Sequence, residues 1–457
     1  MAGIGFELRR LLRKNTLLSL VQTYAYASVI GSGPWVFSIV GILLMGLLSV
    51  GLVAPPFLVT QFQTSVTYLV AFSLIWTGLA QLAFTRFISD RLFEKRSEMV
   101  LPNLHGLLLL VLGSACLIGI AACFTLLSGQ SMLYRMLMLS GFALLCGIWI
   151  LTVLLSGMKR YKAITVLFAV SYTLIVLISL VLRYYGLEGL LGSFVIGHLL
   201  LFCGMWVLVL REFNPHRRLI AFDFLQPKSL YGTLVLTGFL YNLGIWADKL
   251  MFWAYPDTSQ VIIGGLRASL IYDIPVFLSY LSIIPGMAVF LVRIETDFVE
   301  YYDKFFTAVR QGGSLEEIDT MRDEMAYAIQ SGLSEIAKIQ TLAVLVTFVA
   351  GPAVLRLLGI SELYLPLLHV QVVGAALQVG LMAVLNVFFY LDERRIVVWL
   401  CVELLVLNIL LTALSLELGA AFYGYGFAGA MLITLCTGLH LLSREIGRLE
   451  YKTFMLQ

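Results

Sequence analysis

Three charged residues interrupt long apolar runs of this sequence. Asp248 and Lys249 are neighbours in one run, and Asp273 lies in the next. Ionisable side chains inside a membrane-spanning helix are costly and mark a path, a proton relay or an ion pair. If the two runs cross a membrane in opposite directions, Lys249 and Asp273 share a depth of about 8 Å at 1.5 Å per residue. The sequence therefore predicts a Lys249–Asp273 pair, with Asp248 as the alternative partner, facing a cavity.

An amide, a cation and two indole rings share one face of the same run. Asn242, Trp246, Lys249 and Trp253 follow at i, i+4, i+7 and i+11, a spacing that places them on one helical stripe. Aromatic rings stack on sugar faces and amides bind hydroxyl groups, so the stripe suits a path for a sugar polymer. The alternative is a structural ion pair beside tryptophans anchored at the membrane surface.

Three further polar residues are candidates for the same path. Glu403 is isolated in its apolar run and is either a protonatable site or the neighbour of a polar side chain. Tyr24 and Tyr26 precede a break in the first apolar run. They line either the inner mouth of the path or an interfacial aromatic belt.

Glycines and one proline mark candidate hinges. Gly31, Gly33 and Pro34 interrupt the first apolar run, where proline removes a helical donor and clashes with the preceding turn. Gly244 lies at a matching depth in the seventh run. The two breaks thus occupy roughly corresponding positions in the two halves of the chain, which show no clear sequence repeat.

No motif for covalent chemistry accompanies these residues. The sequence lacks a P-loop, an HExxH zinc motif and a dinucleotide fingerprint. Its histidines have no metal-ligand or nucleophile spacing around them. We therefore expect no enzymatic activity, no cofactor and no metal site.

Composition places the apolar runs in a membrane. Hydrophobic residues make up 60% of the 457 residues and charged residues 12%, whereas soluble domains carry roughly a quarter charged residues. Lipid must solvate that much apolar surface. The predicted fold class is all-α, with about twelve transmembrane helices in two six-helix bundles. The predicted spans are 17–50, 59–85, 103–127, 133–157, 163–184, 187–210, 229–254, 267–292, 339–358, 363–390, 396–416 and 422–443.

The distribution of lysine and arginine supports this count. With the N-terminus inside, 25 of the 30 cations fall in inside segments, four fall in outside segments, and Lys249 lies within a span. An error of one span in the count would assign all later loops to the wrong side of the membrane, and this asymmetry of charge would be lost. The asymmetry therefore predicts a multi-pass protein of the bacterial inner membrane with both termini in the cytoplasm.

The topology divides the chain into five segments. Residues 1–16 form a cytoplasmic amphipathic helix. Residues 17–210 form the first bundle, 211–228 a basic cytoplasmic connector, 229–443 the second bundle and 444–457 a cytoplasmic tail.

The longest polar segment is the cytoplasmic loop 293–338, which carries ten of the 27 acidic residues. Residues 293–310 are predicted to form one amphipathic helix that Gly312-Gly313 ends. Ser314 and Glu317 then form a capping box for a second helix. The loop is either a solvated connector or a docking surface for a cytoplasmic partner, and its aromatic residues favour docking.

Several motifs resemble the Pel exopolysaccharide exporter family. They are Ala2-Gly3-Ile4-Gly5-Phe6-Glu7-Leu8-Arg9-Arg10-Leu11-Leu12 with Gly31-Ser32-Gly33-Pro34-Trp35, then Asn242-Leu243-Gly244-Ile245-Trp246-Ala247-Asp248-Lys249, and Tyr272-Asp273-Ile274-Pro275. The resemblance implies a fold of the multidrug/oligosaccharidyl-lipid/polysaccharide flippase superfamily and a polymer rich in N-acetylated amino sugars. It also implies a PelF-like cytoplasmic glycosyltransferase and PelD- and PelE-like membrane proteins as partners. It carries over no catalytic residue.

The leading hypothesis is export of a growing polysaccharide from cytoplasm to periplasm. A long polymer cannot be enclosed in one transport cycle, so we favour a continuous path opened by the partner synthase. A flippase for lipid-linked oligosaccharides predicts a lateral opening and a cationic cavity, and intramembrane cations are few. An intramembrane transferase needs acid and base groups at one depth and larger outside loops. A non-transporting scaffold of the synthase predicts export that does not depend on Asp248, Lys249 or Asp273.

Overall fold

The computed structural model describes residues 22–24, 26–28, 56–158, 160–213, 218–227 and 230–455. These residues are mostly helical and form two compact units. The α3–α8 unit holds the described residues of 56–269. The α9–α16 unit holds those of 270–455 together with the helical residues 22–24 and 26–28. The predicted amphipathic helix 1–16 and the candidate hinge at Gly31, Gly33 and Pro34 lie outside the described residues.

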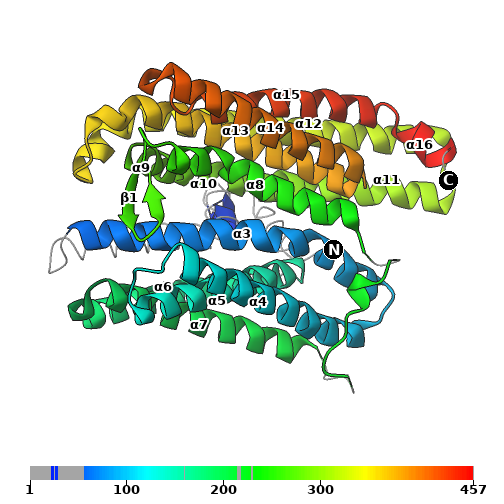
Figure 1. Cartoon of the computed structure of the whole chain (residues 1–457). Coiled ribbons are helices and arrows are strands. Elements are labelled where there is room, and N and C mark those ends of the chain that lie inside the picture. The colour runs from blue at the N-terminus through cyan, green and yellow to red at the C-terminus, as the bar shows by residue number, and fades with distance from the viewer. Residues whose placement is uncertain are drawn as a thin grey trace. The chain divides into compact units, whose positions relative to one another are not determined.

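The α3–α8 unit is a bundle of long helices in which α3 packs on α5 and α8, and α5 also packs on α4 and α7 (Figure 1). Its helices are α3 (Pro56–Phe93), α4 (Val100–Thr125), α5 (Met132–Gly157), α6 (Tyr161–Leu182), α7 (Gly186–Glu212) and α8 (Gly232–Ala254). Short 3₁₀ turns join them, namely η1 (Ser97–Met99), η2 (Arg183–Tyr185) and η3 (Asp223–Leu225). Gly186 reverses the chain between α6 and α7 at a φ of 63°, a conformation that favours glycine.

Two glycines bring the backbones of α3 and α8 into close contact. A Cβ atom added at Gly238 lies 2.2 Å from the carbonyl oxygen of Gly78, and one added at Gly78 lies 2.6 Å from that of Gly238. The sequence placed α8 at the start of a second bundle, after the connector 211–228. In the structure the compact unit that contains α8 runs to Ser269, and the division into two six-helix bundles stays a prediction.

A small hairpin departs from the predicted all-helical fold. Strand β1 (Gln260–Ile263) pairs antiparallel with β2 (Leu266–Ala268). The β-branched run that ends at Ile263 favours an extended strand, and Gly264, at a φ of 57°, suits a two-residue hairpin turn. The predicted eighth span, 267–292, therefore begins as a helix only at Leu270.

In the α9–α16 unit, the eighth predicted span is broken in the middle. Helix α9 (Leu270–Ser279) contains Pro275, the 3₁₀ turn η4 (Tyr280–Ile283) follows, and α10 (Ile284–Val292) has Pro285 in its first turn. Proline cannot donate the helical hydrogen bond and fits only a first turn without strain. The two prolines therefore account for the interruption.

The predicted loop 293–338 is helical with one sharp turn. A π-helix, η5 (Arg293–Phe298), precedes α11 (Val299–Gln311), so the single helix predicted at 293–310 is in fact two elements. Gly312 ends α11 at a φ of 70°, and the Ser314 hydroxyl accepts a 3.2 Å hydrogen bond from the Glu317 amide. This confirms the predicted cap. Helix α12 (Leu315–Leu357) then runs unbroken through residue 338 into the predicted ninth span.

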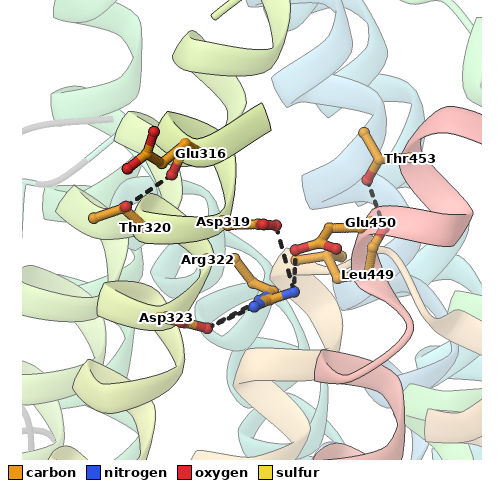
Figure 2. A network of polar contacts seen from close by, with 8 residues as sticks. All are labelled: Glu316, Asp319, Thr320, Arg322, Asp323, Leu449, Glu450 and Thr453. Carbon is orange, nitrogen blue, oxygen red and sulfur yellow. Dashed lines mark hydrogen bonds and ion pairs between the residues drawn. The ribbon is translucent and has the colours of Figure 1, made fainter. Parts of the chain in front are cut away.

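The rest of the unit packs on α12 and α13. The elements are η6 (Glu362–Tyr364), α13 (Leu365–Tyr390), α14 (Arg394–Leu418), η7 (Ala420–Phe422), α15 (Tyr425–Ile446) and α16 (Leu449–Met455). Helix α13 packs on α12 and α15, and α14 packs on α15. Figure 2 shows how α16 is fixed to α12: Arg322 of α12 forms ion pairs with Asp323 at 2.8 Å, with Asp319 at 3.7 Å and with Glu450 of α16.

Nine described helical stretches are long and apolar enough to cross a membrane. The chain is therefore a multi-pass membrane protein, and helices lie over every predicted span from 59–85 onward. One of the nine stretches, Tyr161–Glu212, contains both α6 and α7, and α8 is not among them. Most of the first predicted span, 17–50, lies outside the described residues.

Candidate substrate path

The charged pair of α8 is buried, and its two members bond to each other. Asp248 is 0% exposed and Lys249 is 3% exposed. The Lys249 ammonium donates to both carboxylate oxygens of Asp248 at 3.2 Å and to the carbonyl oxygen of Ile245 at 3.0 Å. The long lysine stem folds back along the helix, so neighbouring residues can meet. Asp273 belongs to the other unit, and its pairing with Lys249 stays a prediction.

The aromatic stripe on α8 is present but only part of it is open. The Lys249 ammonium lies 5.8 Å from the Trp246 ring centroid, and the Trp246 and Trp253 rings are 6.2 Å apart. Trp253 is 3% exposed and stacks on Tyr68 of α3 at 4.5 Å. Trp253 therefore packs inside the α3–α8 unit, whereas Trp246 is half-buried.

The remaining sequence candidates near α8 have local roles. The Asn242 amide donates to the Gly238 carbonyl of its own helix at 2.8 Å, next to the close contact between α3 and α8. Gly244 is buried within a continuous helix, so the structure shows no break at this candidate hinge. Asp273 lies in the first turn of α9 and is half-buried.

A second polar cluster, which the sequence did not single out, surrounds Arg293 at the start of η5. The Arg293 guanidinium donates to Glu335 of α12 through Nε at 2.6 Å and Nη2 at 2.7 Å, and to Asp297 through Nη1 at 2.7 Å. Its charge also acts on the hydroxyl of Tyr24, with which it hydrogen-bonds. Tyr24 therefore contacts the end of the eighth predicted span.

Glu295 extends this cluster to α13. Its carboxylate accepts a hydrogen bond from the Asn386 amide at 3.0 Å and another from the Tyr390 hydroxyl at 3.2 Å. The side-chain oxygen Oδ1 of Asn386 is buried and has no hydrogen-bond partner among the described residues. A buried acceptor without a partner costs free energy, so this oxygen suits a hydroxyl or amide donor of a ligand.

Aromatic side chains surround the Glu295 side of the cluster. The rings of Phe298 and Tyr302 lie 5.5 Å and 5.7 Å from the Tyr390 ring, and Tyr302 lies 4.6 Å from Phe306. Phe298 is fully buried, whereas Tyr302 and Tyr390 are partly exposed. Carboxylate, amide and aromatic groups together are suited to binding a sugar.

The π-helix explains how these side chains reach two neighbours. Arg293 bonds to Glu335 of α12 and to Asp297, while Glu295 between them bonds to Asn386 of α13. π-Helices are rare and frequently lie at functional sites. The sequence signal was the alternation Arg293-x-Glu295-x-Asp297 directly after an apolar run, but the amphipathic period predicted an ordinary helix here.

The other candidates lie apart from these clusters. Glu403 of α14 accepts a 2.8 Å hydrogen bond from the Thr437 hydroxyl of α15, which agrees with the alternative of a polar neighbour. Tyr26 is half-buried. In the described part of the chain, no group of three or more His, Cys, Asp or Glu side chains could hold a metal ion.

Solved structures with this architecture are membrane transporters. An outward-facing multidrug resistance MATE family transporter of the MOP superfamily matches with a TM-score of 0.67 and 15% identity, over 94% of this chain and 96% of that one. A MATE in complex with MaL6 gives 0.66 at 14% identity, over 94% and 96%. A MOP superfamily transporter from Pyrococcus furiosus gives 0.62 at 15%, over 93% and 96%. At these identities the likeness shows the fold.

Sequence comparison identifies the family. No curated protein sequence matches the chain. The family model PelG, exopolysaccharide exporter (EPS-E), matches residues 1–454, which is nearly the whole length. The chain therefore belongs to the PelG family of exopolysaccharide exporters and has the fold of MOP superfamily transporters.

Proposed function

We propose that this protein exports an amino-sugar-rich, Pel-like polysaccharide across the bacterial inner membrane, from cytoplasm to periplasm. Membership of the PelG family supports export of a polysaccharide. The uneven distribution of cations supports cytoplasmic termini, and the MOP fold supports twelve spans in two six-helix bundles.

The observation that carries the proposal is the cluster around Glu295. Its carboxylate, the Asn386 side-chain oxygen that accepts no hydrogen bond from the described residues, and the partly exposed rings of Tyr302 and Tyr390 are groups that bind hydroxyls, amide N–H groups and sugar faces. Residue 293 begins the predicted cytoplasmic loop, so the cluster lies where a polymer made in the cytoplasm enters. In the α3–α8 unit, Asp248, Lys249 and Trp246 are further proposed contacts of the polymer.

Polymer synthesis and export are coupled in this proposal. The cytoplasmic loop 293–338 is acidic and aromatic and is the proposed docking surface for a PelF-like glycosyltransferase. PelD- and PelE-like proteins are the proposed membrane partners. Because α12 runs unbroken from Leu315 to Leu357, movement of its cytoplasmic half by a docked synthase is transmitted into the membrane.

A flippase for lipid-linked oligosaccharides is the second candidate, and the MOP fold favours it. Such a flippase needs positive charge for a pyrophosphate group. Lys249 is 3% exposed and its ammonium bonds to the adjacent Asp248 carboxylate, so it has no accessible donor for a pyrophosphate group. Export of polymer by a continuous path agrees better with the groups present.

The test measures secreted polymer against polymer retained in the cell. Glu295→Gln keeps the size of the side chain and removes its charge, and Tyr390→Phe removes one hydroxyl. We expect both to reduce secretion at normal protein level and with normal co-purification of partners. Glu98→Gln, an exposed carboxylate of η1 outside the loop 293–338, is the matched control.

The same assay distinguishes the alternatives. Asp248→Asn, Lys249→Met and Asp273→Asn test the other charged candidates for the path. Normal secretion in these variants and in Glu295→Gln, together with loss of partner binding on changing the loop 293–338, would instead establish a scaffold. Accumulation of a lipid-linked oligosaccharide in the cell, without retained polymer, would establish the flippase.

A further inference from the structure

The connector between α7 and α8 exposes an unusual number of large apolar side chains. Five of them are between 41% and 76% exposed, namely Leu219, Ile220, Phe222, Leu225 and Leu230. In the sequence the same connector carries Arg217, Arg218 and Lys228. Apolar side chains interleaved with cations are typical of a segment that lies in the membrane interface.

The described residues 218–227 of the connector are bonded to the bundle. The Ala221 amide donates to the Pro102 carbonyl at 2.9 Å, and the Asp223 amide donates to the Asn103 side chain at 2.8 Å. Phe224 packs edge-on against Phe84 of α3 at 5.6 Å. The exposed apolar residues are therefore part of an ordered surface.

This packing closes one end of an apolar groove of about 240 Å³. The groove runs along α3 from Trp76 to Phe84, about 12 Å at 1.5 Å per residue, and the other walls are α4, the connector and the start of α8. Its polar lining is Ser114, whose hydroxyl donates to the Val111 carbonyl and accepts from the Trp76 indole. The lining thus offers no polar group that needs a ligand.

The groove is open to the surroundings of α4, because the lining residue Leu110 is 43% exposed. Around a membrane-spanning helix those surroundings are lipid. The free volume therefore suits a hydrocarbon chain, and water is excluded from it by the absence of polar partners.

A cation follows the part of α3 that lines the groove. Arg86 follows the lining residue Phe84 by two positions on α3, and its side chain is 43% exposed. The guanidinium lies 5.9 Å above the ring of Tyr231, the neighbour of the lining residue Leu230, and its Nε pairs with Asp90 at 3.2 Å. Asp90 and Tyr231 thus orient Arg86, which keeps exposed donors for a phosphate.

We infer that the connector and the groove form a binding site for an anionic phospholipid of the surrounding bilayer. One acyl chain lies in the groove between Trp76 and Phe84, and the phosphate is bound by Arg86. The cytoplasmic leaflet, in which the positive-inside rule places the connector, carries the anionic lipids. The bound lipid fixes the connector in the membrane interface and so holds the adjoining ends of α7 and α8 at a constant depth in the bilayer.

Native mass spectrometry of the detergent-solubilised protein tests this site. The protein is incubated with equal amounts of phosphatidylglycerol and phosphatidylcholine. We expect the wild type to retain phosphatidylglycerol preferentially, by roughly tenfold, because both lipids offer a phosphate to Arg86 but the choline ammonium of phosphatidylcholine cancels the net negative charge. Arg86→Gln removes the preference, and Ala83→Trp, which fills the groove, removes binding of both lipids.

Matched variants separate this site from general lipid contact. Leu117→Trp changes a residue of α4 that is 72% exposed and outside the groove lining, and Arg183→Gln removes a cation of η2. Both retain wild-type lipid binding. Ala80→Leu fills less of the groove and is used if Ala83→Trp does not elute as a monodisperse protein. Unchanged phosphatidylglycerol binding after filling the groove, or equal retention of the two lipids by the wild type, overturns the inference.

Discussion

Arg293 and Glu335 form a two-bonded ion pair that joins the π-helix η5 to α12, with Nε–Oε2 at 2.6 Å and Nη2–Oε1 at 2.7 Å. The residues are 42 positions apart in the sequence. This pair fixes the start of the predicted cytoplasmic loop against the long helix that returns to the membrane. It also places Glu295, two residues on, toward α13.

Arg293→Lys replaces the planar fork by a point charge, which cannot hold both oxygens of Glu335. Both side chains are about one-third exposed, so solvent weakens the pair and we expect a loss of about 1 kcal/mol in unfolding free energy. Thermal unfolding in detergent measures it. Arg310→Lys is the control, because Arg310 bonds only within its own helix as far as described contacts show. Equal destabilisation by the two variants would contradict the prediction.

Variants of the buried Asp248–Lys249 pair on α8 distinguish a structural role of the pair from a role in transport. Asp248→Asn or Lys249→Met alone leaves a buried charge without its neighbour, and we expect a loss of roughly 3–5 kcal/mol and a lower protein level. The double variant Asp248→Asn/Lys249→Met removes both charges and restores the level. If the pair lines the path, secretion stays low in the double variant.

A double variant with normal level and normal secretion would make the pair structural. The readouts are the amount of protein in the membrane and the ratio of secreted to retained polymer. Glu403→Gln serves as the control for an intramembrane carboxylate whose described partner is the neutral hydroxyl of Thr437.

The close contact between α3 and α8 predicts which glycines cannot be replaced by alanine without loss of stability. Gly78→Ala and Gly238→Ala each place a methyl group 2.2–2.6 Å from an opposing carbonyl oxygen, and helix backbones cannot yield as a side chain does. We expect a loss of about 1–3 kcal/mol from overpacking. Gly113→Ala in α4 meets nothing within 4 Å and is expected to be neutral or slightly stabilising. Unfolding temperatures in one detergent compare the three, and a tolerant Gly238→Ala would argue against the close contact.

Attachment of α16 to α12 is predicted to depend on pH. The pKa of Glu450 lies above its ordinary value of 4.5 because it hydrogen-bonds with Asp319 and is desolvated, while the charge of Arg322 opposes the shift. A carboxyl with a raised folded-state pKa contributes stability below its unfolded pKa and loses it as pH rises through the folded value. We therefore expect hydrogen exchange of α16, corrected for intrinsic rates, to be slowest near pH 4.5 and faster toward neutral pH.

Asp319→Asn tests the cause of this dependence. Without the second carboxylate, the pKa of Glu450 falls toward its ordinary value, and the slope of α16 protection against pH flattens. Glu316→Gln, which is exposed on the same helix turn (Figure 2), should leave the slope unchanged. A steep slope retained in Asp319→Asn would exclude the Asp319 carboxylate as the cause.

The sequence by itself determined the helices and the local signals that end them. Composition identified the membrane-spanning runs, because lipid exposure demands long apolar helices irrespective of what they pack against. The stop at Gly312 and the cap at Ser314 were predicted correctly, since a positive φ and a side-chain cap depend on adjacent residues only. The common face of Trp246, Lys249 and Trp253 follows likewise from helical spacing.

Tertiary structure decided which of these residues meet. The bonds of Glu295 to Asn386 and of Arg293 to Glu335 join residues 91 and 42 positions apart, and neither can be inferred from spacing within one helix. The grouping of α8 with α3 depends on two glycines that the apolar pattern does not distinguish from their neighbours. In the π-helix 293–298, Arg293 bonds to α12 and Glu295 to α13, contacts that only the packing of these helices provides. Local sequence sets which segments are helical, whereas the free energy of packing one helix on another sets their partners.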